Sequence, residues 1–330
     1  MLVTDVEGSK STKALALTGM IVGAMALGSL FVGATTVSPT ELLLGENSAS
    51  LSILLASRIP RLVALVLAGC SMAVAGSIMQ MLSRNRFVEP GTAGTIESAT
   101  LGLLLVALLV PGLPIIAKML VACTTALIGT LLFLAILRRV PLRSPLLVPL
   151  IGLMLGGVIN AAATFLAYRF DLLQSLVAWS SGDFSTVLRG RYELLWVSFA
   201  AAAAAYITAD RFTVAGLGQD FAINLGLNYR RTLFTGLVIV SIVTASVVAT
   251  VGAIPFVGLV VPNIVSLVVG DNVRRSVPWT AVLGAGFVLA CDLIGRAVIW
   301  PYEVPVGPII GIVGSGIFLL LMGRGRVRFG

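Results

Sequence analysis

Apolar runs of about 20 residues recur along the whole chain, separated by short stretches rich in Pro, Gly and charged residues. Each run is long enough to cross the roughly 30 Å hydrocarbon core of a bilayer as a helix. The predicted spans lie at about 14–34, 60–82, 92–110, 115–137, 146–168, 191–209, 232–251, 256–270, 279–298 and 305–323. The pattern therefore predicts an all-α membrane protein with about ten transmembrane helices, in a single domain over residues 1–330.

The composition agrees with this pattern. Of the 330 residues, 58% are hydrophobic and 11% are charged, and the mean hydropathy is +1.06. Soluble domains average roughly 25% charged residues. The first apolar run, near Lys13, lacks a small-residue cleavage site followed by polar sequence, so we interpret it as a retained helix and not a signal peptide. The net charge of +8 fits basic cytoplasmic loops better than nucleic-acid binding, because no basic surface interleaved with aromatic residues stands out.

The distribution of Lys and Arg predicts the orientation, because cytoplasmic loops of membrane proteins carry an excess of both. With ten spans and a cytoplasmic N-terminus, the C-terminus is also cytoplasmic, and fifteen of the 22 Lys and Arg residues fall at cytoplasmic ends. The seven at outer ends are Arg58, Arg61, Lys118, Arg169, Arg189, Arg191 and Arg296. Arg58 and Arg61, in "SRIPR" at the start of the second span, depart from the rule, which indicates a function for them.

A few polar side chains lie inside predicted spans, where a charge costs roughly 2.5–3.5 kcal/mol near a helix centre. Asp292 and Arg296 are four residues apart, so we expect a structural ion pair on one helix face. Glu97 is either a carboxylate that lies near the cytoplasmic end or in a wet cavity, or an acid that lines a transport pathway. Gln80 and Asn160 either hydrogen-bond between helices or face a cavity, and the sequence leaves both possibilities open.

Other chemistry is disfavoured. The chain has no histidine and no phosphate-binding G-x-x-x-x-G-K-[ST] motif, and its cysteines, Cys70, Cys123 and Cys291, lie inside apolar runs like small core residues. We therefore expect no metal site, no cofactor and no catalytic residue. Uphill transport would need energy from another subunit.

The alternatives are an ion-coupled secondary transporter, with Glu97 and Asp292 as its coupling site, and a membrane-embedded enzyme, which the scarcity of nucleophile–base pairs disfavours.

Two further segments are distinctive. The longest polar cytoplasmic stretch, residues 210–231, contains "DFAINLGLN", a short amphipathic helix candidate that ends at Gly226. A rigid helix of this kind is what a membrane subunit needs in order to follow a soluble ATPase. The second segment, residues 252–275, is a span interrupted by Pro255 and Pro262, which we place near the bundle interior because neighbouring helices must satisfy its freed backbone groups.

Four ordered stretches together carry a family resemblance. They are "SRIPRLVALVLAGCSMAVAGSIMQMLSRNRFVEPGTAGT", "INLGL", "VGAIPFVGLVVPNIVSLVVGD" and "CDLIGRAVIWPYEVPVG". The chain resembles the iron-chelate and cobalamin permeases of bacterial ABC importers from about residue 55 to its C-terminus. The "PNIVS" and "GRYELLW" stretches look like the siderophore branch of that family.

The resemblance implies a type II ABC importer permease fold in the bacterial cytoplasmic (inner) membrane. It implies a second permease subunit, identical or a paralogue, two cytoplasmic ATPases and an extracytoplasmic substrate-binding protein. Arg58, Arg61 and Arg296 would dock that binding protein. The residues that couple to the ATPase would be Asp220, Ala222, Leu225, Gly226 and Leu227. The cargo implied is a ferric siderophore, with cobalamin or haem as alternatives.

The sequence also departs from the family pattern. Arg86 replaces a usual proline, Asn263 a histidine and Ser266 an arginine, and Glu97 stands where a small residue is more usual. These changes bear on the substrate more than on the fold. The candidate pathway residues are Gln80, Glu97, Asn160, Pro262 and Asn263.

Overall fold

The computed structural model describes residues 2–32, 48–140 and 146–323, and over these ranges the regular structure is helical. The elements are α1 (Leu2–Ser29), α3 (Ser48–Ile53), η1 (Leu54–Arg58), α4 (Ile59–Ser83), η2 (Gly91–Ala93), α5 (Thr95–Leu109), α6 (Ile115–Leu137), α7 (Leu147–Arg169), α8 (Leu173–Ser180), α9 (Leu194–Ile207), α10 (Ala209–Gly216), α11 (Gln219–Asn224), α12 (Tyr229–Val251), α13 (Val257–Val269), α14 (Val273–Ala297) and α15 (Val306–Gly323).

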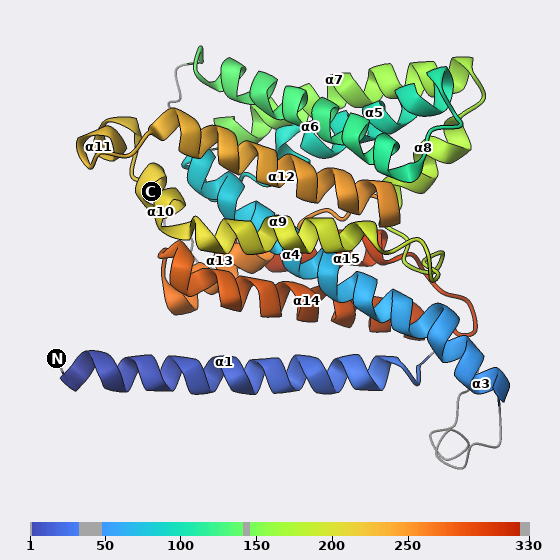
Figure 1. Cartoon of the computed structure of the whole chain (residues 1–330), viewed down its shortest axis with the longest axis horizontal. Helices are drawn as coiled ribbons and strands as arrows, with labels where there is room; N and C mark the ends of the chain where they lie inside the picture. The colour runs from blue at the N-terminus through green and yellow to red at the C-terminus, as the bar shows by residue number, and fades with distance from the viewer. Residues whose placement is uncertain (1, 33–47, 141–145, 324–330) are drawn as a thin grey trace.

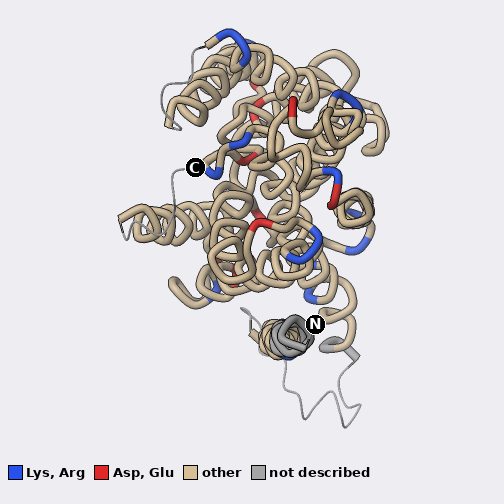
Figure 2. The backbone as a smooth tube through the Cα atoms, turned by 90° about the vertical axis from the view of Figure 1, so that its left-hand side faces the viewer, with Lys and Arg blue, Asp and Glu red and all other residues tan. Residues whose placement is uncertain are grey.

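The helices form one bundle with α4 at its centre. α4 packs against α9, α12, α13 and α14, and most of its residues are buried. Helices α5 to α8 lie together on one side of the bundle, joined to the rest through α12 (Figure 1). α1 stands apart and touches the bundle along α14, as the view onto the α11 end shows (Figure 2).

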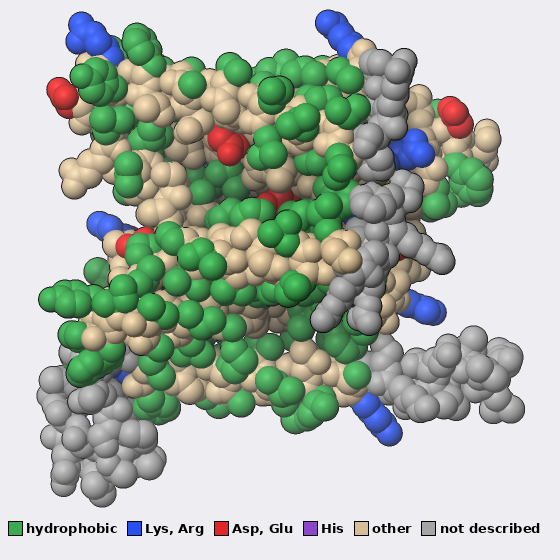
Figure 3. Space-filling model, turned by 180° about the vertical axis from the view of Figure 1, so that it is seen from behind, with side chains coloured by type: hydrophobic (Ala, Val, Ile, Leu, Met, Phe, Trp, Pro, Cys, Tyr) green, Lys and Arg blue, Asp and Glu red, His purple; other side chains and the backbone are tan. Residues whose placement is uncertain are grey.

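Each predicted span coincides with a helix, although several ends differ. Seven helices in the described part of the chain are long and apolar enough to cross a membrane, and α5, α9 and α13 are shorter apolar helices. The first span was predicted to end near residue 34, but α1 ends at Ser29. Helices α8 and α10 were not predicted. The space-filling view shows Lys and Arg at the two ends of one face, with a hydrophobic band between them (Figure 3).

The helix that contains "SRIPR" begins well before Pro60, contrary to the expectation that Pro60 opens it. α3, η1 and α4 run on continuously, with one π-helical turn over Leu54–Arg58. Proline has no N–H and clashes with the carbonyl four residues back, which here is Ala56 O. The π turn accommodates that proline, and Ala56 O accepts a hydrogen bond from the backbone N–H of Arg189 at 3.2 Å.

The break between α12 and α13 is satisfied in a similar way. The backbone of the connecting stretch from Gly252 to Phe256 is not helical. The N–H of Ala253 donates to Trp179 O at 2.9 Å, and the N–H of Asp183 donates to Val251 O at 2.8 Å. The end of α8 therefore supplies the hydrogen bonds that this broken span needs.

Close approach of backbones holds α13 and α14 onto α4. Gly76 of α4 faces Gly258 of α13, and Gly69 of α4 faces Gly284 of α14. A Cβ atom built at Gly76 would overlap the backbone of Gly258. Small residues at such contacts let membrane helices gain van der Waals packing, because lipid provides no hydrophobic driving force between helices.

We predict that Gly76→Ala destabilises the protein by about 1–3 kcal/mol, the usual cost of overpacking, because the added methyl group meets backbone and not a flexible side chain. The thermal midpoint of the detergent-purified protein, followed by size-exclusion chromatography, should fall. Gly23→Ala on α1 is the matched control, since a Cβ there meets no atom within 4 Å. An unchanged midpoint for Gly76→Ala would show that this glycine pair does not set the helix spacing.

Candidate functional site

A cavity of about 650 Å³ opens on the side of the bundle bounded by α5, α7, α13 and α15. Its wall is mostly apolar, and two of the predicted pathway residues, Glu97 and Asn160, line it. Glu97 lies in the first turn of α5, and its carboxyl group sits against Gly156 of α7. Asn160 is one helical turn further along α7 and is exposed. The cavity can hold a largely apolar solute with a few polar groups.

Glu89 also lines this cavity and was missed from the sequence. Its Oε1 accepts the backbone N–H of Phe256 at 2.8 Å, at the start of α13, where a helix dipole favours negative charge. The residue is only 2% exposed. Burial raises the pKa of the Glu89 carboxyl to about 7, against the lowering effect of the Phe256 N–H, and the nearby Glu97 adds to the increase. In the sequence, the glutamate directly before Pro90 in "VEPG" was the signal that could have identified this residue.

The other predicted pathway residues lie elsewhere. Gln80 donates from Nε2 to Gly258 O at 3.2 Å, the carbonyl that Pro262 leaves without a partner inside α13. Asn263 is 2% exposed and donates from Nδ2 to Arg86 O at 2.9 Å and to Leu259 O at 2.7 Å. Gln80 therefore makes the interhelical hydrogen bond and, with Pro262, also lines the second cavity described below, while Asn263 holds the α4–η2 loop against α13. Neither Gln80, Pro262 nor Asn263 lines the large cavity.

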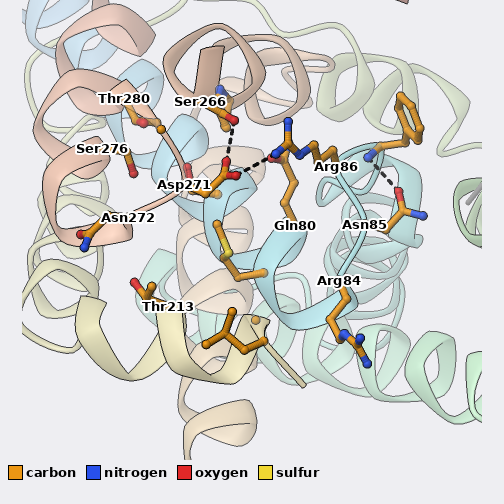
Figure 4. Close-up of a pocket in the computed structure, with 17 residues that line it drawn as sticks. Gln80, Arg84, Asn85, Arg86, Thr213, Ser266, Asp271, Asn272, Ser276 and Thr280 are labelled. Atoms are coloured by element: carbon orange, nitrogen blue, oxygen red, sulfur yellow. Dashed lines mark hydrogen bonds and ion pairs between the residues drawn. The ribbon is translucent and has the colours of Figure 1, made fainter. Parts of the chain in front are cut away.

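A second cavity, of about 540 Å³, lies between the end of α4, α10 and the α13–α14 turn (Figure 4). Asp271 lines this cavity and contacts Arg86 and Ser266, two of the residues that differ from the family pattern. Arg86 Nη2 lies 2.7 Å from Asp271 Oδ2, and Ser266 Oγ donates to Asp271 Oδ1 at 2.6 Å. The family pattern has an arginine at the position that Ser266 occupies in this chain. The guanidinium group of Arg86 thus supplies a positive charge beside that position.

The predicted coupling loop folds into α10 and α11 at one end of the molecule (Figure 1). α11 ends in a Schellman motif: the N–H of Leu227 donates to Ala222 O, and the N–H of Gly226 donates to Ile223 O, both at 2.9 Å. Gly226 has φ +78°, the left-handed conformation that this motif requires. Ala222 is fully buried. The "INLGL" stretch therefore contains a helix-stop pattern, and the buried Ala222 anchors α11 to its neighbours.

The outward face of α11 is apolar although it lies beside basic residues at the end of the molecule. Phe221, Ile223 and Leu225 are each more than half exposed. Asp220 is exposed, and Arg84, at the end of α4, has its guanidinium group beside Gly218. These side chains give α11 an exposed apolar surface.

At the opposite end, the three arginines predicted to dock a binding protein, Arg58, Arg61 and Arg296, are buried within the chain. They are 8%, 8% and 6% exposed. Asp292 and Arg296 form the ion pair that their spacing suggested, with 2.5 Å between Oδ2 and Nη2. Arg61 joins them through Nη2, 2.7 Å from Asp292 Oδ1, and through Nη1, 2.5 Å from Glu303 Oε2.

Two of these arginines, Arg58 and Arg296, also tie the end of α1 to the bundle. Arg296 Nη1 donates to Ser29 O at 3.0 Å and to Val32 O at 2.8 Å, and Arg58 Nη1 donates to Leu30 O. Because the helix extends upstream of Pro60, Arg58 packs among helix contacts and does not project past a helix start.

Comparison with known proteins identifies the family. A model of the FecCD transport family matches residues 15–324. The chain belongs to the FecCD transport family.

Relatives of this FecCD chain include the petrobactin import system permease protein YclN of Bacillus subtilis, 49% identical over 91% of this chain and 95% of the relative. The ferric-anguibactin transport system permease protein FatD of Vibrio anguillarum is 43% identical over 90% and 94%. A solved structure described as an inward-facing metal-chelate type ABC transporter superimposes with a TM-score of 0.80 at 22% identity, covering 95% of this chain and 99% of that one. The fold is therefore that of the ABC importer permeases.

We predict that Asp292→Asn lowers the stability of this FecCD chain by about 3–5 kcal/mol, because it leaves the buried guanidinium groups of Arg61 and Arg296 without their shared anion. The thermal midpoint of the purified protein should fall sharply. Asp210→Asn is the matched control, since it breaks an exposed pair with Arg274 and should leave the midpoint unchanged. Equal midpoints for the two variants would contradict a stabilising role for the buried cluster.

Proposed function

We propose that this chain is the membrane-spanning permease subunit of an ATP-driven importer of ferric siderophores. The observation that carries the proposal is the match along nearly the whole chain to relatives named as petrobactin and anguibactin permeases. The large mid-bundle cavity and the apolar face of α11 support it. A relative named as a vitamin B12 import permease is 34% identical, so cobalamin is the second cargo to test.

In the proposed assembly, two permease subunits, identical or paralogous, form one pathway above two cytoplasmic ATPases. The α11 end faces the cytoplasm, as the bias of Lys and Arg favours. The chain is a single permease domain, and residues 210–231 form its coupling loop. The chelator keeps the iron wrapped, so the permease itself needs no iron ligand.

The mechanical link would run from α11 into the bundle core. The ATPase would bind the exposed side chains of Phe221, Ile223 and Leu225, while the buried Ala222 fixes α11 to its neighbours. α11 packs on α10, and α10 packs on α4 and α14. Movement of the ATPases would thus reach α4 and, through Gly76 and Gly258, the helix α13 that borders the cavity. Coupling requires that ATP favours one of the two pathway states over the other.

Ion-driven transport with Glu97 and Asp292 as a joint coupling site fits the geometry poorly. Asp292 is paired with Arg61 and Arg296, and it is absent from the described lining of the cavity that holds Glu97.

The function is tested by transport in proteoliposomes that contain the complete complex with its binding protein. We expect uptake of ⁵⁵Fe-labelled siderophore to require internal ATP and to cease with a hydrolysis-deficient ATPase. Labelled cyanocobalamin measured in the same vesicles distinguishes the second cargo. Siderophore uptake that persists without hydrolysis, or uptake of cobalamin alone, would refute the proposal.

In the same vesicles, Gly226→Val should lower ATP-driven uptake about tenfold, because a β-branched residue pays roughly 1–2 kcal/mol to adopt the left-handed conformation. A Cβ atom at this position meets no atom within 4 Å, so the bundle itself should fold normally. Gly226→Asn is the control, since asparagine tolerates this conformation. Normal uptake and normal ATPase co-purification in Gly226→Val would remove α11 as the coupling element.

We place docking of the binding protein at the end opposite α11. Direct contact by Arg58, Arg61 and Arg296 stays a prediction and would require their buried cluster to open. The exposed cations beside them are Arg189, whose backbone bonds to η1, and Arg191. They would steer an acidic partner mainly through the association rate.

Reversing both charges, Arg189→Glu with Arg191→Glu, should slow association of the binding protein at low salt, with a smaller effect at high salt. Association kinetics on immobilised transporter give the measurement. Arg230→Glu with Arg231→Glu, exposed at the α11 end, is the control and should leave the rate unchanged. Equal rates for all three proteins would exclude docking through Arg189 and Arg191.

A further inference from the structure

The large cavity holds two carboxyl groups without a matching cation among its described lining residues. Glu89 and Glu97 both line it, and of its described lining residues none is Lys or Arg. The Oε2 atom of each carboxyl group is buried and has no hydrogen-bond partner among the described residues. In Figure 3, acidic atoms are visible in the hollow near the middle of the hydrophobic face, away from the basic residues at its two ends.

The two carboxyl groups differ in what the fold requires of them. Glu89 holds the start of α13 through the N–H of Phe256, which accounts for one of its oxygens. No comparable structural bond holds Glu97 Oε2, which lies against the backbone of Gly156. An ionisable group inside a membrane protein is costly, and it is normally paired or functional. A ligand that supplies the missing positive charge would offset that cost.

The surroundings of Glu97 define what such a ligand must be. The Glu97 carboxyl group packs against Gly156, and Gly157 leaves open space, since a Cβ atom there would meet no atom within 4 Å. Asn160 follows Gly156 by four residues, so its amide lies on the same face of α7. The rest of the wall is mostly apolar. A bare divalent metal ion would need about six oxygen ligands, which this wall does not provide. An ammonium group on a largely apolar molecule needs only a carboxylate and one or two further acceptors.

We propose that Glu97 binds a protonated amine of the transported ferric chelate, with the Asn160 amide oxygen as a second acceptor, and that the permease thereby favours chelates that carry such an amine. This inference rests on the proposed function, because it takes the cavity as part of the transport pathway. Glu89 contributes a second negative charge while it holds α13.

The test uses the complete transporter in proteoliposomes and two ⁵⁵Fe-loaded chelators that differ at one group. One is a catecholate chelator with a free secondary amine in its backbone, and the other is the same chelator with that amine acetylated. We expect Glu97→Gln to lower uptake of the amine chelate about tenfold, as loss of a charge-assisted hydrogen bond implies, and to leave uptake of the acetylated chelate unchanged. The wild-type and Glu97→Gln transporters use the same binding protein. A difference between them in the ratio of amine-chelate uptake to acetylated-chelate uptake is therefore due to the permease.

Glu97→Asp keeps the charge and should retain most of the preference, and the yield of assembled complex checks that each variant folds. Equal losses for both chelates in Glu97→Gln, or no loss for either, would overturn the amine site while leaving siderophore import intact. Failure of the wild-type complex to transport either chelate would instead count against the proposed function.

Discussion

A carbonyl group freed inside a hydrocarbon layer has no water to bond to, and much of this fold follows from that constraint. Pro60 frees Ala56 O, and the N–H of Arg189 occupies it. Pro262 frees Gly258 O, and the side chain of Gln80 occupies it. Each proline therefore creates a long-range hydrogen bond, and together these bonds tie the loop before α9 to η1 and α4 to α13. The prolines that interrupt the helices thus also connect them.

Buried charge obeys the same constraint. At the end opposite α11, Asp292 lies between two guanidinium groups and Glu303 takes up part of the excess positive charge. At the α11 end, the exposed Asp271 is likewise paired, with Arg86 and Ser266. Glu97 breaks the pattern, since its buried oxygen has no hydrogen-bond partner among the residues that the structure describes. Glu97 also lines the large cavity, and this is why we connect it to the cargo.

The packing around α4 relates the two ends of the molecule. Its first turn holds the arginine cluster and its last turn lies beside α10 and the start of α11, while its middle is held by glycine contacts to α13 and α14. A rigid helix in such close contact can transmit a displacement from one end to the cavity without a large local deformation. The fold thus suits a subunit whose energy source acts at one end of the bundle while its cargo binds in the cavity.

The sequence by itself determined the features that depend on local pattern. Runs of apolar residues located the helices, the spacing of Asp292 and Arg296 predicted their ion pair, and the Gly226 signal located the end of α11. Tertiary structure alone decided which way the remaining polar side chains point. Arg61 meets Asp292 across 231 positions of sequence, and Gln80 meets Gly258 across 178. The local pattern predicts that a buried polar group needs a partner, but the partner depends on how the helices pack, which no local spacing encodes.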